Sequence, residues 1–177
     1  MKTTTKALNA KLARVKLFLC DVDGVLTDGA IFISAAGETK RFFIQDGLGL
    51  HQLQRAGIKV GWISNRPSVA TTRRAQELKI DFLSQGKGSK VAAAEEILAK
   101  TKLTFAEICF VGDDIVDLAL LKRAGVAIAV ANAVEEAKAA ADFVTKAPGG
   151  HGAIREVCEL ILKAQNKWAE VLRRFST

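Results

Sequence analysis

Short apolar runs alternate with helix-length amphipathic segments along most of this 177-residue chain. Four runs are nearly continuous in Val, Ile, Leu and Phe, as is typical of strands buried on both faces of a sheet: Val15–Asp21, Ile58–Ser64, Ile108–Gly112 and Val126–Val130. Asp81–Leu83 and Phe143–Thr145 are shorter candidates. This alternation predicts an α/β fold, a Rossmann-like parallel sheet with helices on both faces.

The predicted helices lie between these runs and after the last one: Gly47–Ala56, Val69–Leu78, Ser89–Lys100, Asp114–Arg123, Val134–Ala140 and a long helix from about Ala153 to Arg173. One stretch breaks the alternation. Ala30–Ser34 and Thr39–Ile44 flank Ala35-Ala36-Gly37-Glu38, which predicts a β-hairpin with a four-residue loop. We therefore expect one domain over residues 1–177, with a hairpin insertion at about 30–44.

Composition excludes several classes of protein. The apolar fraction of 49% is too high for a disordered chain. No apolar run approaches the ~20 residues that cross a bilayer, and Met1–Arg14 lacks the apolar core of a secretion signal, so we expect a cytoplasmic protein without membrane association. The net charge of +7 favours anionic partners, but the basic residues are scattered and aromatics are few, which argues against nucleic acid. Cys20 and Cys109 lie in predicted strands, as reduced core thiols.

The strongest chemical signal is Asp21-Val22-Asp23-Gly24, at the end of the first predicted strand. In open α/β sheets, ligands bind at the carboxyl ends of the strands. Taken alone, the tetrapeptide also fits a strand end with a simple Asx-turn.

A second acidic cluster, Gly112-Asp113-Asp114, ends another predicted strand. Carboxylates at two neighbouring strand ends repel each other unless a cation lies among them. Mg²⁺ suits a site of few carboxylates together with phosphate and water. Asp117, one helical turn further on, is expected to cap and orient the loop rather than bind the ion.

Two further motifs suit a phosphate group. Ser64-Asn65-Arg66-Pro67 closes a strand where a helix is expected to begin, with Pro67 at an early helical position, and a helix N-terminus offers free N–H donors. A plain N-cap serine is the alternative. Lys87 and Lys90 lie around two glycines before a helix, where either could reach a phosphate or remain in solvent.

The order of these four motifs resembles the haloacid dehalogenase-like phosphatase superfamily. Over nearly the whole chain, the sequence is similar to one of its families, the 3-deoxy-D-manno-octulosonate 8-phosphate phosphatases. The segments that carry this resemblance are Asp21–Gly29, the hairpin, Asp46-Gly47-Leu48-Gly49, Gln85-Gly86-Lys87-Gly88-Ser89-Lys90, Gly112-Asp113-Asp114 and Gly149-Gly150-His151-Gly152-Ala153-Ile154-Arg155-Glu156.

The resemblance implies a phosphatase with a covalent intermediate. Asp21 would attack phosphorus and form an aspartyl phosphate, while Asp23 would act as general acid and then as general base. Mg²⁺ would be held by the Asp21 carboxylate, the Asp23 backbone carbonyl and Asp113, with Asp114 helping through water. The residues that would hold the phosphoryl oxygens are Ser64, the Asn65 amide and Lys90, the last favoured over Lys87.

The family positions that bind the sugar correspond here to Phe43, Ile44, Gln45, Asp46, Gly47, His51, Arg66 and Arg74. Arg66 and Arg74 match the family pattern. Phe43, Gln45 and His51 stand where the lipopolysaccharide-pathway enzymes typically carry Asn, Arg and Arg; Asn65 replaces a Gly and His151 an Arg. The substrate implied is 3-deoxy-D-manno-octulosonate 8-phosphate or another acid-sugar phosphate.

The resemblance implies a protein without a cap domain that forms a homotetramer. Its hairpins would build a central β-barrel, and neighbouring subunits would close each active site. Three other functions stay open on the residues. They are phosphoryl transfer by a mutase or kinase, hydrolysis of another small metabolite or of nucleic-acid ends, and a non-catalytic phosphatase-like partner.

Overall fold

The computed structural model describes residues 5–35 and 37–176. Its centre is a six-stranded parallel sheet in the order β5-β4-β1-β6-β7-β8. The strands are β1 (Leu17–Cys20), β4 (Lys59–Ser64), β5 (Phe82–Gln85), β6 (Ile108–Gly112), β7 (Val126–Ala129) and β8 (Phe143–Val144). The predicted Rossmann-like sheet is confirmed, including its two shorter strands.

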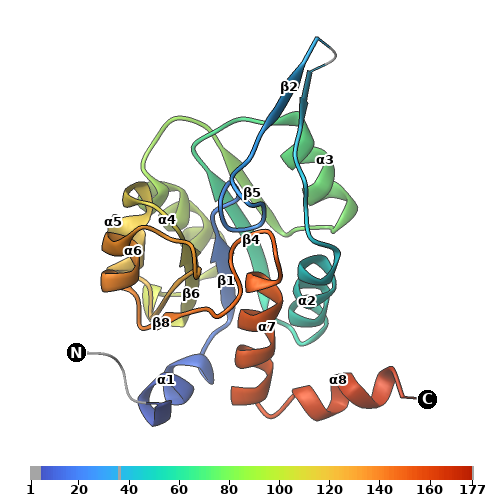
Figure 1. The fold of residues 1–177 in the computed structure, drawn as a ribbon. Helices are drawn as coiled ribbons and strands as arrows, with labels where there is room; N and C mark the ends of the chain where they lie inside the picture. Colours follow the sequence, from blue (N-terminus) through green and yellow to red (C-terminus); the bar gives the residue numbers. More distant parts are fainter. Residues whose placement is uncertain (1–4, 36, 177) are drawn as a thin grey trace.

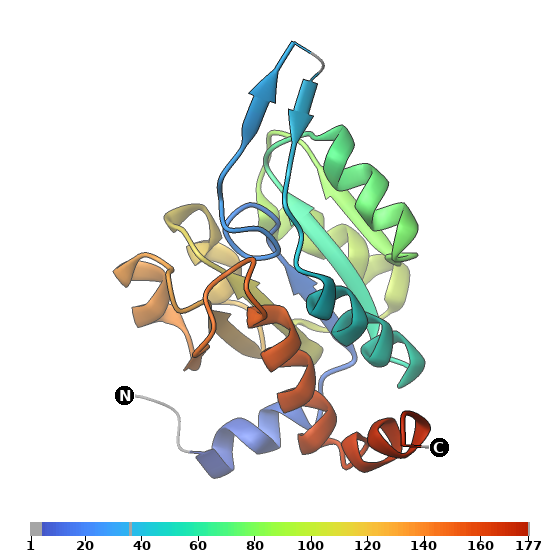
Figure 2. The same cartoon turned by 45° about the vertical axis from the view of Figure 1, so that its right-hand side comes forward.

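Helices cover both faces of the sheet (Figures 1 and 2). On one face, α2 (Ile44–Arg55) packs against α7 (Ala153–Ala164). On the other, α4 (Lys90–Thr101), α5 (Leu118–Leu121) and α6 (Glu135–Ala140) follow one another. α3 (Val69–Glu77) connects β4 to β5, and short 3₁₀ turns cover Phe105–Glu107 and Ile115–Asp117.

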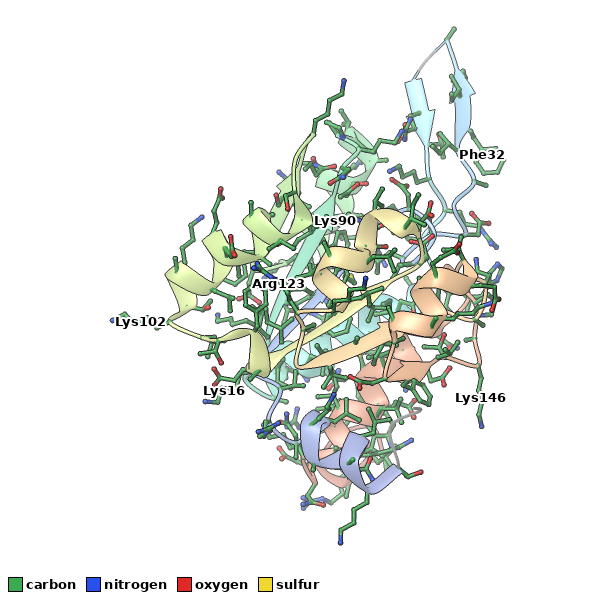
Figure 3. The ribbon with its side chains drawn as sticks, turned by 90° about the vertical axis from the view of Figure 1, so that its left-hand side faces the viewer. Lys16, Phe32, Lys90, Lys102, Arg123 and Lys146 are labelled. Atoms are coloured by element: carbon green, nitrogen blue, oxygen red, sulfur yellow. The ribbon has the colours of Figure 1, made fainter. Side chains whose placement is uncertain are left out.

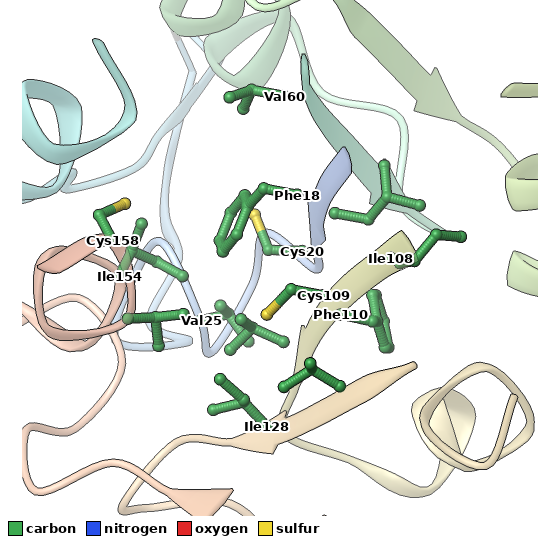
Figure 4. Close-up of a cluster of buried hydrophobic side chains, with 14 of the residues drawn as sticks. Phe18, Cys20, Val25, Val60, Ile108, Cys109, Phe110, Ile128, Ile154 and Cys158 are labelled. Carbon is green, nitrogen blue, oxygen red and sulfur yellow. The ribbon is translucent and has the colours of Figure 1, made fainter. Parts of the chain in front are cut away.

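The core is centred on β1, which is completely buried. Cys20, its last residue, lies opposite Trp62 of β4 and Val111 of β6. Figure 4 shows Cys20 and Cys109 among the apolar side chains between the sheet and α7. Both are buried free thiols, as predicted. Because β1 is central, the residues that follow it emerge in the middle of the carboxyl edge of the sheet.

The β-hairpin, β2 (Phe32–Ser34) and β3 (Gly37–Thr39), projects from this edge, away from the described ends of the chain (Figure 1). It is the segment inserted between β1 and α2, and the described residues contain no separate cap domain. The predicted four-residue loop is wrong, since Gly37 and Glu38 pair with Ser34 and Ile33; Ala36 lies outside the described residues.

The second arm of the hairpin is also shorter than predicted. It ends at Thr39, and α2 begins at Ile44 rather than Gly47. Directly after β3, the buried side chain of Lys40 turns toward the body of the fold, where it pairs with Asp23.

Other boundaries differ from the prediction. An unpredicted helix, α1 (Thr5–Leu12), buries Leu8 and Leu12, one turn apart. The predicted final helix is two helices, because Asn166 adopts a left-handed conformation (φ 56°) and α8 (Trp168–Arg174) starts anew. The predicted helix Asp114–Arg123 is a 3₁₀ turn followed by the short α5. Across the described ranges, every helix is too short or too polar to span a lipid bilayer.

Candidate active site

The chemical motifs come together at the carboxyl edge of the sheet. Asp21 follows β1, Ser64 ends β4 and Asp113 follows β6, and these three parallel strands are neighbours. Lys90 starts α4 and lies in the body of the fold, whereas Phe32 lies on the projecting hairpin (Figure 3). A pocket of about 190 Å³ opens there, lined by Asp21, Asp23, Ser64, Asn65, Arg66, Lys90, Asp113, Asp114 and Val116.

Lys90 joins the carboxylates at the floor of this pocket. Its ammonium lies 2.8 Å from Asp21 Oδ1 and 2.6 Å from Asp117 Oδ1. All three side chains are buried. Although burial opposes its charge, the carboxylates of Asp21 and Asp117 raise the pKa of Lys90 above its ordinary value. Lys90 is thus a fixed cation, whereas Lys87 is exposed.

Asp117 holds the acidic loop after β6. Its Oδ2 accepts the backbone N–H groups of Asp113 (2.9 Å) and Asp114 (3.2 Å). This is the capping position expected from its spacing. Its carboxylate also fills the space beside Gly112, where an added Cβ would lie 2.7 Å from it. The loop that carries Asp113 is therefore fixed by a buried side chain.

Negative charge exceeds positive charge at the floor of the pocket. One carboxylate oxygen from each of Asp21, Asp113 and Asp117 lies within 4.8 Å of the others. Burial, and after it the neighbouring carboxylates, raise the pKa of Asp113. Burial also raises the pKa of Asp21, against the opposing attraction of Lys90. A divalent cation would stabilise the charged forms of these carboxylates.

The residues present fit a Mg²⁺ ion. Asp113 Oδ1 is buried and has no hydrogen-bond partner among the described residues, which leaves a hard oxygen ligand available. Asp113 Oδ2 lies where a Cβ on Gly24 would be, only 2.1 Å away, and Gly24 has φ +93°. Only glycine at position 24 lets the loop after β1 and the carboxylate after β6 approach so closely.

The turn after β4 presents Ser64, Asn65 and Arg66 to the pocket. The Ser64 hydroxyl accepts the Arg66 N–H at 3.1 Å, which closes a tight turn. The prediction that a helix begins here, with Pro67 at an early helical position, is wrong. Ser68 caps α3 by accepting the Thr71 N–H at 3.3 Å, so Pro67 precedes the helix. The N–H groups near Ser64 belong to a turn and not to a helix N-terminus.

Two charged residues that the sequence motifs did not indicate, Glu38 and Lys40, contact side chains that line the pocket. The Lys40 ammonium contacts both oxygens of Asp23, at 2.6 Å and 2.9 Å. Glu38 accepts the Ser68 hydroxyl at 2.7 Å and pairs with Arg66. Both come from the hairpin and the residue that follows it. The one sequence signal was their i, i+2 spacing, which places two charged side chains on the same face of an extended segment.

One predicted sugar-binding residue, Arg74, lines a second, larger hollow. This hollow has a volume of about 730 Å³ and lies between the hairpin and α3, with Glu38 and Lys40 on its wall. Arg74 lines this hollow and pairs with Glu77 at 2.8 Å. Gly47 lies against Arg74, since a Cβ on Gly47 would be 2.8 Å from Arg74 Nη2.

The remaining predicted sugar-binding residues lie outside both hollows. The buried Asp46 carboxylate accepts the Arg155 N–H at 2.7 Å, at the start of α7, and burial raises its pKa to about 6. Phe43 lies beside His151, with ring centroids 6.5 Å apart. Ile44 and Gln45 are exposed and His51 is half-buried.

The glycine-rich tail before α7 rests on the loop after β1. Gly150 donates its N–H to Val25 O at 3.0 Å. A Cβ on Gly149 would lie 1.8 Å from the Gly24 carbonyl oxygen, so the two backbones are in direct contact. His151, further along, lies 2.9 Å from an Arg41 side-chain nitrogen. The tail therefore buttresses the loop that carries Asp23.

Comparisons with known proteins agree with this geometry. A sequence model of haloacid dehalogenase-like hydrolases matches residues 64–156. The chain is 39% identical over 158 residues to the 3-deoxy-D-manno-octulosonate 8-phosphate phosphatase of Yersinia pestis, covering 89% of this chain and 84% of that protein.

Two solved structures of related phosphatases share the fold. The 3-deoxy-D-manno-octulosonate 8-phosphate phosphatase of Moraxella catarrhalis, in complex with magnesium ion, phosphate ion and KDO, has a TM-score of 0.94 at 41% identity, covering 97% of this chain and 99% of that one. The cobalt-bound enzyme of Haemophilus influenzae has a TM-score of 0.86 at 40% identity, covering 89% and 92%. The present chain therefore belongs to the 3-deoxy-D-manno-octulosonate 8-phosphate phosphatase family of the haloacid dehalogenase-like hydrolases.

Proposed function

We propose that this protein hydrolyses the phosphomonoester of a small acid sugar, and that 3-deoxy-D-manno-octulosonate 8-phosphate, the substrate named for its relatives, is that compound. One observation carries the proposal. The Asp21 carboxylate lies at the floor of a pocket, 2.8 Å from a buried lysine, with three further phosphatase motifs around it. A neighbouring hollow with Arg74 on its wall offers room for the rest of an anionic sugar.

The chemistry proposed for the chain has two steps. In the first, an Asp21 oxygen forms a bond to phosphorus, the bond to the sugar oxygen breaks, and Asp23 gives that oxygen its proton. In the second, Asp23 takes a proton from water as the water oxygen attacks phosphorus, which frees phosphate and restores Asp21. Asp23 suits both steps because it lines the same pocket two residues away from Asp21.

The other lining residues position the phosphoryl group. Lys90 supplies a fixed positive charge, and the Ser64 hydroxyl and the Asn65 amide supply hydrogen bonds to phosphoryl oxygens. The residues proposed to hold Mg²⁺ are Asp21, Asp113 and, through its backbone carbonyl, Asp23, with Asp114 nearby. Bound there, the ion would withdraw charge from the phosphoryl oxygens and reduce their repulsion of the nucleophile.

We further propose that the protein is a homotetramer assembled through its hairpins. Phe32 and Ile33 of β2 are 62% and 80% exposed, and Ile44 at the start of α2 is 72% exposed. A two-stranded hairpin is marginally stable alone, and exposed apolar edges favour association. Pairing with copies around a symmetry axis would cover these side chains and let neighbouring subunits close the pockets. A cytoplasmic location stays a prediction.

The function is tested by a panel of substrates with Mg²⁺ present: acid-sugar phosphates, neutral sugar phosphates, nucleotides and 5′-phosphorylated oligonucleotides. We expect the highest kcat/KM for 3-deoxy-D-manno-octulosonate 8-phosphate. A preference for oligonucleotides would show that the scattered positive charge serves nucleic acid. No hydrolysis of any phosphate, by a folded protein that binds Mg²⁺, would favour a non-catalytic partner.

A further inference from the structure

The hairpin side of the pocket holds a buried lysine that the chemistry above does not use. Lys40 has no exposed side-chain area, although it belongs to the segment between β3 and α2. A buried lysine is costly unless it is paired, so its position needs an explanation. Its partners are the Asp23 carboxylate, the Thr71 hydroxyl at 3.3 Å and, further away, Glu38 at 3.7 Å.

The contact with Asp23 is made through both carboxylate oxygens. Within the described residues, Lys40 is the one side chain that bonds to this carboxylate. Asp23 keeps 21% of its side-chain area exposed, so without Lys40 it would be free to rotate away from the pocket. A general acid must lie within hydrogen-bond reach of the oxygen it protonates, and its orientation therefore limits the rate.

The position of Lys40 is in turn set from two sides. Thr71, in the first turn of α3, accepts a hydrogen bond from its ammonium and is itself buried. On the chain side, Lys40 directly follows β3, so the placement of the hairpin determines where the lysine begins. The Lys40 side chain alone therefore links the end of the hairpin to Asp23.

We propose that Lys40 is a positioning residue for Asp23. The lysine holds the Asp23 side chain toward the leaving group, where the carboxyl group delivers its proton, so this general-acid step depends on how the hairpin is seated. The proposal rests on the proposed phosphatase function. A purely structural ion pair between the hairpin and the catalytic loop is the alternative.

The test compares two leaving groups. An alkyl phosphate such as the sugar phosphate needs a proton on its departing oxygen, whereas 4-nitrophenolate leaves without one. The quantity measured is kcat/KM, because it reports the steps up to formation of the phosphoryl-enzyme. For Lys40→Met we expect kcat/KM to fall about 10²-fold with the sugar phosphate and only a few-fold with 4-nitrophenyl phosphate. Lys40→Arg should restore part of the loss. Lys59→Met, which removes an exposed lysine paired with Asp81 at the other end of β4, is the control.

A double-mutant cycle gives a second readout. In an Asp23→Asn background, Lys40→Met should change kcat/KM by no more than about twofold, since the lysine acts through the missing carboxylate. Equal losses with both leaving groups, or a full further loss in the Asp23→Asn background, would overturn the proposal. If Lys40→Met does not fold, Thr71→Val should show the same leaving-group bias at smaller size, and equal losses would again overturn it. Failure of the proposed function is distinct, because the wild-type protein would then hydrolyse neither substrate.

Discussion

Two groups of charged side chains meet at the pocket, and the structure holds them in different ways. The strand-end group is buried: Asp21, Lys90 and Asp117 have 9%, 2% and 0% of their side-chain area exposed. It stands on the ends of β1 and β6 and the start of α4, inside the covered sheet. The hairpin group, Glu38 and Lys40, reaches the same pocket from a ribbon that projects beyond it.

The contrast separates two requirements of a catalytic site. The groups proposed to make and break bonds lie on elements whose geometry is fixed by the core, as precise chemistry requires. The groups at the mouth lie next to β2, whose apolar side chains are exposed. The Lys40 side chain is buried like the strand-end group, but its backbone directly follows the hairpin, so its placement is linked to the hairpin as well as to the core.

Removing Asp21, the proposed nucleophile, should have the largest effect on activity. Asp21→Asn should lower kcat about 10⁴-fold or more, because no other carboxylate in the pocket can take its place. The change also removes one of the repelling charges, so the variant should stay folded by circular dichroism. Activity close to wild type would mean that no covalent intermediate forms on Asp21.

Chelation tests the strand-end group as a metal site. EDTA should reduce activity to background and added Mg²⁺ should restore it, because Asp21 and Asp113 offer hard oxygen ligands. The measurement is phosphate release before and after titration with Mg²⁺. Full activity after exhaustive chelation would show that the carboxylates work without a divalent ion.

The hairpin group is tested through assembly. Ile33→Glu combined with Ile44→Glu should dissociate the proposed tetramer in light scattering and lower activity, while the melting temperature of the metal-bound core changes little. Leu172→Glu, at an exposed apolar position on α8, is the matched control and should do neither. A wild-type protein that is monomeric and fully active at assay concentration would contradict the proposal that neighbouring subunits complete the active site.

A smaller effect should appear in stability. Asp113→Asn should raise the melting temperature of the metal-free protein, by about 2–4 °C for each kcal/mol of repulsion removed. The same change should reduce the stabilisation that Mg²⁺ gives to the folded state. Differential scanning calorimetry with and without Mg²⁺ measures both. A metal-free variant that melts lower than wild type would show that these carboxylates do not repel.

The smallest effect concerns Asp46, whose pKa is raised from 3.8 to about 6 in the folded protein. A carboxyl group with a raised pKa stabilises the fold while it is protonated, and this stabilisation is lost as the pH rises from about 4 through 6. Over that window, wild-type stability should fall relative to Asp46→Asn by on the order of 1–3 kcal/mol. Urea unfolding at pH 4, 5, 6 and 7 measures it. If the unfolding free energies of the two proteins changed with pH in parallel, Asp46 would not titrate in this window.

The sequence predicted the strand-end group better than the hairpin group, for a physical reason. Asp21, Ser64 and Asp113 lie at the ends of apolar runs, and parallel strands bring their carboxyl ends to one edge whatever their separation along the chain. Lys40 has no such signal, because its burial arises from side-chain contacts with Asp23 and Thr71 that no local pattern encodes. The helix break at Asn166 was missed similarly, since a single left-handed residue interrupts an otherwise helical pattern.

The same limit applies to the sugar-binding positions. Of the positions that the family resemblance assigned to the sugar, Arg66 lines the pocket and Arg74 the larger hollow, while Asp46 accepts a backbone N–H at the start of α7. A resemblance transfers positions in a sequence. It does not transfer the directions of the side chains, which depend on the contacts that each residue makes in this chain.

The contact between Gly149 and the Gly24 carbonyl has a consequence for how this protein can change over generations. Where side chains meet, a larger residue on one side can be offset by a smaller one on the other. Two glycine backbones in contact leave no such exchange, since neither residue has anything to shrink. Substitutions in the tail and in the loop after β1 are therefore linked. A chain that keeps one of these two glycines should keep the other.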